Sequence, residues 1–281
     1  MKFSAYSLLS IALVVGLVPF LNGQQATVSR TATAQALSNP DTPDSCPHLF
    51  TSGNSGSATF IQYCVTDSGA ITSIQTPFGH FQIGTGGEGY GVCQESPALE
   101  YHDYAVSDTG NWNSPQILSL TNSLIKVSRT TSDGNWTLVQ TISKVAATGS
   151  IKIVMALTNN QSVDKVAYLV RFADVDPDGH GYHSAAAGAS VQSAFGWSTD
   201  PSSLHYGLHL ENTGKWTGYQ QGFVQSILSG PNACAFAYNT IPGSYYVSNG
   251  FRDDDTSLVY AYVGVVPAHK AITVTLNYRG T

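Results

Sequence analysis

The sequence predicts an all-β protein that folds as a large antiparallel two-sheet sandwich. Apolar and polar residues alternate in about a dozen short runs, and turn signals separate these runs at intervals of about 8–15 residues. No stretch shows the alternation of strand-like and helix-like patterns that is typical of strand–helix–strand units. Charged residues make up only 11% of the 281-residue chain, and Gly and Tyr are abundant, a composition typical of extracellular β-proteins.

The chain is expected to begin with a secretory signal peptide over residues 1–23. Lys2 supplies a positive start and Leu8–Phe20 an apolar segment that is too short for a stable membrane span. A retained N-terminal anchor is the alternative. Residues 24–45 are rich in Ala, Thr, Ser and Gln and are expected to be a disordered leader. A single β-sandwich domain is then expected over residues 46–281.

The charge pattern bears on the choice of partner. The formal net charge is −6, and the twelve Lys and Arg residues are scattered along the chain. Nucleic acids and anionic membranes need a clustered basic face, so neither is expected as a partner once the signal peptide is removed.

The four cysteines are Cys46, Cys64, Cys93 and Cys234. An even number in an exported chain favours two disulfides, and three pairings are possible. We favour Cys46–Cys64, which would pin the start of the domain to its first strand and leave Cys93–Cys234 as a long-range bond.

The alternating runs place the strands in order along the chain. Strands are expected over Thr59–Val65, Ile71–Thr76, Phe81–Ile83, Leu124–Arg129, Trp136–Ile142, Ile151–Leu157, Val166–Phe172, Leu204–Glu211, Phe223–Leu228, Cys234–Tyr238, Leu258–Val265 and Ala271–Tyr278. Ser132–Asn135 contains Asp-Gly, a strong hairpin signal. The glycines of Gly84–Gly91 are expected to allow a bulge or a close backbone approach. The small residues of Ser184–Ser193 indicate a short helix or an irregular loop.

Some of these segments carry a resemblance to known proteins. The segments are Glu88-Gly-Tyr-Gly-Val-Cys93, Arg129-Thr-Thr-Ser-Asp-Gly134 with Leu138-Val-Gln-Thr141, and Arg171-Phe-Ala-Asp-Val-Asp176. They resemble a group of secreted bacterial β-sandwich proteins of unassigned activity. The last two strands are similar to the end of the supersandwich domains found in mutarotases and polysaccharide-degrading enzymes. The resemblance implies a fold and carries no catalytic residues with it.

An acidic loop follows the Val166–Phe172 strand. Asp174, Asp176 and Asp178 alternate ahead of Gly179 and offer oxygen ligands for a structural calcium ion. A complete EF-hand would need Glu at the position of Ala185, so backbone carbonyls, water or a distant carboxylate would complete the site. The alternatives are a plain Asp-Pro-Asp-Gly turn held by its own hydrogen bonds, and a catalytic use.

Four residues are candidates for acid–base catalysis: Glu88, His102, His209 and Glu211. A glycosidase needs two carboxylates about 5–10 Å apart, and an epimerase or lyase pairs His or Tyr with a carboxylate. Glu100, close to His102, belongs to the same group of candidates. The polar outer face of a strand would show the same pattern.

Aromatic residues supply a candidate substrate-binding surface. Trp112, Tyr182, Trp197 and Trp216 lie in or beside polar, Gly- and Asn-rich segments. Exposed rings of this kind stack on sugar rings, while polar neighbours bind the hydroxyl groups. Trp136 lies within a strand and is expected to be buried.

These observations predict a secreted, carbohydrate-active protein whose partner is an extracellular glycan. As an enzyme it would cleave or isomerise the glycan. The alternatives are a non-catalytic carbohydrate-binding protein with a structural calcium ion, and a cell-surface or matrix protein. A deep pocket with converging carboxylates would favour an enzyme. A shallow strip of aromatic residues would favour a binding protein, and a flat face with an exposed strand edge would favour a structural role.

Overall fold

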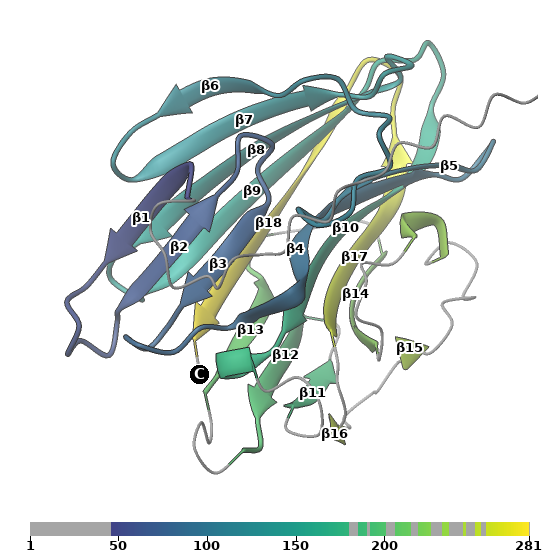
Figure 1. Cartoon of the computed structure of the whole chain (residues 1–281). Coiled ribbons are helices and arrows are strands. Elements are labelled where there is room, and N and C mark those ends of the chain that lie inside the picture. Colours follow the sequence, from purple (N-terminus) through teal and green to yellow (C-terminus); the bar gives the residue numbers. More distant parts are fainter. Residues whose placement is uncertain are drawn as a thin grey trace, which may run out of the picture. The chain divides into compact units, whose positions relative to one another are not determined.

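Within the residues that the structure describes, the chain forms eighteen strands, and all of their pairings are antiparallel (Figure 1). In this computed structural model the described residues are 46–179, 185–189, 192–200, 206–214, 219–225, 232–235, 244–245, 251–253 and 257–280. The expected signal peptide and leader lie outside them. The all-β fold class and the antiparallel sandwich are confirmed.

Three sheets contain these strands. The three-stranded sheet has the order β1 (His48–Ser52), β2 (Ile61–Val65), β3 (Ile71–Gln75). The six-stranded sheet has the order β15 (Ser244–Tyr245), β14 (Tyr219–Gln225), β17 (Ser257–Val266), β10 (Lys165–Val175), β4 (Ile83–Gln94), β5 (Leu99–Asp103). The nine-stranded sheet has the order β16 (Phe251–Asp253), β11 (Ala185–Ala189), β12 (Ser193–Ser198), β13 (Gly207–Asn212), β18 (Ala271–Gly280), β9 (Ser150–Asn159), β8 (Trp136–Val145), β7 (Leu124–Thr130), β6 (Gln116–Leu120).

The main hydrophobic core is built from the inward-facing side chains of all three sheets. Alternation along each strand decides which residues these are, because successive side chains of a strand point to opposite faces. In β9, for example, Ile151, Ile153, Met155 and Leu157 are all fully buried. Trp136 is fully buried as well, which confirms the expectation drawn from its place in a strand.

A second, smaller apolar cluster covers the opposite face of the six-stranded sheet. It includes Tyr104, Phe172 and the disulfide between Cys93 and Cys234, which ties the 3₁₀ turn η3 (Ala233–Ala235) to β4. The other disulfide joins Cys46 to Cys64. The favoured pairing is therefore confirmed, and two disulfides indicate a chain that folds in an oxidising compartment.

Two local expectations were wrong. The segment Ser184–Ser193 contains a strand, β11, which pairs with β12 on one side and with β16 on the other. Its alanines have little intrinsic preference for strands, so pairing with two neighbours decides its conformation. The strand expected from Cys234 is replaced at its start by the 3₁₀ turn η3, in which Cys234 is bonded to Cys93.

A buried ion pair joins the three sheets. Glu88 of β4 and Arg171 of β10 are both fully buried, and Arg171 Nη2 donates to Glu88 Oε2 at 2.7 Å. The Glu88 carboxylate also accepts hydrogen bonds from the hydroxyl of Tyr278 in β18 at 2.9 Å and from the backbone N–H of Ile71 in β3 at 2.6 Å. Arg171 Nη1 donates to Gln140 Oε1 in β8 at 2.7 Å.

The electrostatics of this pair reflect its burial. Desolvation raises the pKa of the Glu88 carboxyl, while the charge and hydrogen bonds of Arg171 lower it less. For Arg171, burial lowers the pKa of the guanidinium, and Glu88 followed by Tyr278 more than offsets this, so the net direction is upward. Arg171 therefore keeps its charge in the core, and Glu88 is its partner.

Removing Arg171 should destabilise the fold strongly. Arg171→Met leaves the Glu88 carboxylate buried without its cation, and we expect the free energy of unfolding to fall by about 3–5 kcal/mol. Urea titration with both disulfides intact measures this value. The matched control is Arg279→Met, since the Arg279 side chain is 50% exposed and its ion pair should contribute no more than about 1 kcal/mol. Equal losses in the two variants would contradict the structural role of the pair.

Candidate functional site

Three nearly parallel rings form a row on the outer face of the nine-stranded sheet. Phe195 lies between Trp197, which is two residues away in β12, and His209, its register partner in β13. The ring centroids of Phe195 and Trp197 are 5.5 Å apart, and those of Phe195 and His209 are 5.1 Å apart, with interplanar angles of 15° and 17°. All three side chains are half-buried. We call Trp197, Phe195 and His209 the aromatic row.

A charged pair continues the row onto β18. Arg279 pairs with His209 in the strand register, and its Nε and Nη2 atoms both lie 2.8 Å from Glu211 Oε1. His209 Nδ1 lies 3.6 Å from the same oxygen. Burial, followed by the positive charge of Arg279, lowers the pKa of the His209 imidazole below its ordinary value of 6.5. The ring is therefore neutral at neutral pH.

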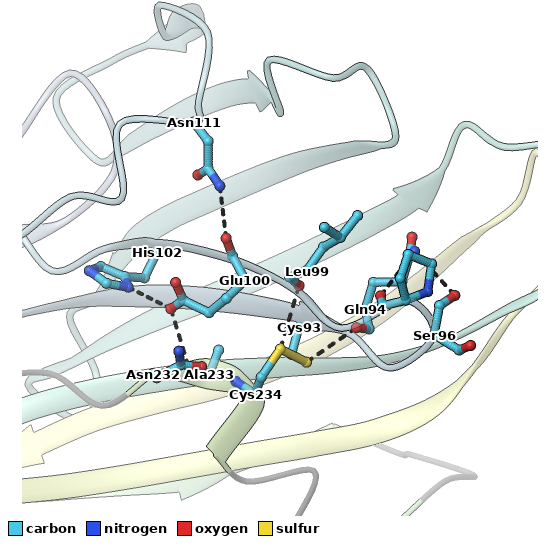
Figure 2. The surroundings of a disulfide bond; sticks show 11 residues. Cys93, Gln94, Ser96, Leu99, Glu100, His102, Asn111, Asn232, Ala233 and Cys234 are labelled. Atoms are coloured by element: carbon cyan, nitrogen blue, oxygen red, sulfur yellow. Dashed lines mark hydrogen bonds and ion pairs between the residues drawn. A yellow bond between two sulfur atoms is a disulfide. The ribbon is translucent and has the colours of Figure 1, made fainter. Parts of the chain in front are cut away.

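Strand β5 brings a second pair of candidate residues together (Figure 2). His102 Nδ1 lies 2.5 Å from Glu100 Oε1, and the backbone N–H of Ala233 donates to the same oxygen at 3.2 Å. The His102 ring stacks on Tyr104 with a centroid distance of 4.6 Å. The sequence placed Glu100 and His102 among the acid–base candidates, and the structure places them in direct contact on the six-stranded sheet.

Two other candidates lie in the core. Glu88 is fully buried within the ion pair described above, so its carboxylate holds the sheets together and is closed to a substrate. Trp112 is 7% exposed and packs edge-on against Tyr90 and Tyr101. Its ring also lies 5.5 Å from the guanidinium carbon of Arg129. The expectation that Trp112 lines a glycan-binding surface is corrected by this position, because its ring faces are covered by core residues.

The three aspartates of the acidic loop do not act as one group. A Cβ atom built on Gly84 would lie 2.1 Å from Asp176 Oδ2 and 2.6 Å from Asp174 Oδ2, so these two carboxylates converge on one place. Asp178 turns away to His80, whose Nδ1 lies 2.8 Å from Asp178 Oδ2. Among the described residues, no group of three or more His, Cys, Asp or Glu side chains could hold a metal ion.

The remaining sequence candidates, Tyr182 and Trp216, lie outside the described residues. Sequence reasoning missed Phe195 and Arg279, which complete the aromatic row and its charged end. Phe195 had a usable signal, because it lies two residues before Trp197 and side chains at that spacing share one face of a strand. Arg279 became a neighbour of His209 only through the pairing of β13 with β18.

Comparison with known proteins supports the fold. No family profile and no curated protein matches the chain. A bacterial glucoamylase in complex with acarbose has a similar structure, with a TM-score of 0.53 at 10% identity, over 83% of this chain and 31% of the glucoamylase chain. A putative aldose 1-epimerase from Escherichia coli K12 gives 0.46 at 10% identity, over 83% and 99% of the two chains. A polysaccharide lyase gives 0.47 at 9% identity, over 78% and 32%.

These likenesses are likenesses of fold. This chain spans 31% of the length of the glucoamylase, so the likeness concerns one part of that protein. No helix in the described part of the chain has the length and apolar character needed to cross a membrane.

The lowered pKa of His209 predicts a pH dependence of stability. The native state binds fewer protons at this ring than the unfolded state does between the native pKa and 6.5, so stability should fall as the pH drops below 6.5. An NMR titration of the His209 ring should give a midpoint below 6.5. In Arg279→Gln the midpoint should move upward, because the second cause of the shift is removed. A midpoint at 6.5 or above in the unmodified protein would contradict this assignment.

Proposed function

We propose that this is an exported protein that binds extracellular carbohydrate through the aromatic row. The observation that carries the proposal is the set of three half-buried, nearly parallel rings with a charged pair at one end. Aromatic rings offer apolar surface to the C–H faces of a sugar. The guanidinium of Arg279 and the carboxylate of Glu211 can donate to and accept from sugar hydroxyls beside them.

Binding is favoured over hydrolysis by the state of the carboxylates. Of the three predicted catalytic carboxylates, Glu88 holds the core together, and Glu211 is held by two nitrogens of Arg279. Glu100 lies on the other sheet and contacts His102. A glycosidase needs one carboxylic acid and one carboxylate on either side of a bond, and this row offers Glu211 with its cation. The row also lies along one face of a sheet.

Two further observations support export and the ligand class. Two disulfides suit an extracellular protein, in agreement with the signal peptide expected over residues 1–23. A bacterial glucoamylase in complex with acarbose shares the fold, which supports a sugar as the ligand class at the level of fold alone. The net charge of −6 argues against nucleic acid as the partner.

A structural role is the second candidate, and one observation favours it. Strand β6 forms an edge of the nine-stranded sheet, and Ile117, Leu118 and Leu120 are 43%, 51% and 51% exposed along it. An exposed apolar edge strand can pair with a strand of another chain. A cell-surface or matrix protein could assemble in this way without a small-molecule site.

The carbohydrate proposal is tested by retention on a panel of immobilised polysaccharides. Trp197→Ala should weaken retention by about tenfold or more, since about 1.4 kcal/mol corresponds to a factor of ten. The matched control is Phe78→Ala, which removes an aromatic ring that is 55% exposed and lies outside the row. The proposal would be contradicted if Trp197→Ala were retained as strongly as Phe78→Ala and the unmodified protein. It would also be contradicted if the unmodified protein were not retained at all, and a structural role of the β6 edge would then be the better candidate.

We also propose that Asp174 and Asp176 hold a structural calcium ion. Their oxygens converge beside Gly84, and carboxylate oxygens are ligands that calcium prefers. Backbone carbonyls and water would have to complete the coordination, because Asp178 is engaged with His80. The ion would hold the end of β10 against β4.

Calcium should then stabilise the native protein. A ligand that binds only the native state adds about 2.7 kcal/mol at a concentration of one hundred times Kd, which is visible as a rise in melting temperature. Thermal melts with added CaCl₂ and with EDTA measure the effect. Asp176→Asn should lose it, whereas Asp67→Asn, at a carboxylate whose side chain is 65% exposed, should keep it. Equal melting temperatures with calcium and with EDTA would contradict the calcium proposal.

A further inference from the structure

A serine, a histidine and a glutamate form a continuous hydrogen-bonded chain at the end of β5. Glu100 Oε1 lies 2.5 Å from His102 Nδ1, and His102 Nε2 lies 2.9 Å from Ser107 Oγ. A carboxylate oxygen only accepts, so Nδ1 carries the proton of the neutral ring and Nε2 is the acceptor that faces the serine hydroxyl. This is the order of groups that activates a serine nucleophile.

We propose that Ser107, His102 and Glu100 form a nucleophilic site that hydrolyses short-chain carboxylic esters. The proposal rests on the geometry of these three side chains and on the loop that presents Ser107. It does not depend on carbohydrate binding, because the aromatic row lies on the nine-stranded sheet and this site lies on the six-stranded sheet.

A tight loop presents Ser107. Residues 103 and 108 pair as an isolated bridge, and the loop between them contains Ala105 with a φ of +64°, in the left-handed region that L-residues rarely adopt. The strained residue is held by a hydrogen bond from its N–H to Asp103 Oδ1 at 3.0 Å. Arg129 Nη1 contacts Asp103 at 2.6 Å and Asp108 at 3.5 Å, so a cation ties both ends of the loop. Such strain persists where the surroundings fix it and is common at functional sites.

The glycine-rich strand β4 lets this loop approach closely. A Cβ atom on Gly89 would lie 2.0 Å from the carbonyl oxygen of Asp103 and 2.7 Å from the Cα atom of Tyr104. Any larger residue at Gly89 would push the loop away from the sheet. The glycine therefore lets the start of this loop, at Asp103 and Tyr104, lie directly against β4.

The general base, His102, is positioned both through its ring and through its backbone. The His102 ring stacks on Tyr104 at an interplanar angle of 13°, and Tyr104 packs against Phe172. The backbone N–H of His102 donates to Thr109 Oγ1 at 3.1 Å. A ring held in this way keeps Nε2 directed at Ser107, which is what a base must do to take the serine proton.

The disulfide positions the glutamate (Figure 2). The Cys93–Cys234 bond fixes η3, whose Ala233 N–H donates to Glu100 Oε1 at 3.2 Å, and Asn111 Nδ2 donates to the backbone carbonyl of Glu100 at 2.8 Å. Glu100 is a positioning residue. It orients His102 and stabilises the imidazolium that forms when the ring takes a proton.

The three side chains of the site keep part of their surface exposed. The side chains of His102 and Glu100 are 16% and 15% exposed, and Ser107 is half-buried. Val106, the residue before the serine, is 46% exposed and offers apolar surface to a short acyl chain. Among the described residues, the backbone N–H groups of Ser107 and Asp108 donate no hydrogen bond to another protein group, so we assign them as the donors for a developing oxyanion.

The reaction proceeds in two balanced steps. Ser107 Oγ attacks the ester carbonyl carbon, its proton passes to His102 Nε2, and His102 then protonates the departing alkoxide, which leaves as an alcohol. Water next attacks the acyl-serine, gives its proton to His102, and the carboxylic acid leaves as the proton returns to Ser107 Oγ. No oxidant, reductant or metal ion is needed.

Hydrolysis of p-nitrophenyl acetate by the disulfide-intact protein tests the proposal. We expect turnover above the background rate, a decrease of about 10³-fold or more in kcat/KM in Ser107→Ala, and labelling of Ser107 by a fluorophosphonate located by peptide mass spectrometry. Glu100→Gln should lower kcat by about 10²-fold or more with little change in KM or in melting temperature, a pattern that a merely structural contact would not produce.

Ser123→Ala is the matched control, since Ser123 lies on an exposed turn between β6 and β7 and should keep full activity and labelling. A melt of each variant separates loss of activity from loss of fold. Hydrolysis or labelling that Ser107→Ala retains would overturn the proposal, as would the absence of both in a correctly folded protein. Neither outcome would affect retention on polysaccharides, which tests the aromatic row separately.

Discussion

The buried ion pair of Glu88 and Arg171 is the interaction on which the rest of the structure depends. Its partners come from β3, β4, β8, β10 and β18, so one charged group and its hydrogen bonds join all three sheets. A pair of charges in a dry core is stable only while every partner is present. The relative placement of the sheets is therefore tied to a small set of polar atoms at the centre.

Along β4 and β13, the residues that pack in the core alternate with the residues that form the candidate sites. In β4, Glu88 and Tyr90 face the core, while Gly89 faces the loop that presents Ser107. In β13, Leu208 and Leu210 are buried, and His209 and Glu211 face outward beside Arg279. Alternation gives each strand one face for packing and another for function. The aromatic row and the ester site occupy the outer faces of different sheets.

The disulfide between Cys93 and Cys234 has a packing role and a role in the proposed ester site. It is part of the apolar cluster that covers the six-stranded sheet, and it also holds the N–H group that fixes Glu100. The disulfide forms in an oxidising compartment. The contact between Glu100 and His102 is therefore positioned only where this disulfide can form. Local order and the proposed chemistry are therefore linked through one disulfide.

The sequence by itself determined the fold class and the core face of the long strands, because alternation is a local property of the chain. It favoured one of three possible cysteine pairings, and the structure decided that pairing. The sequence also pointed to His102, Trp197 and His209. Only the tertiary structure decided what these residues do. Glu88 became a core carboxylate because β10 places Arg171 beside it, and Phe195 joined His209 because β12 pairs with β13. Such neighbours come from strand pairing between distant segments, and no local pattern records it.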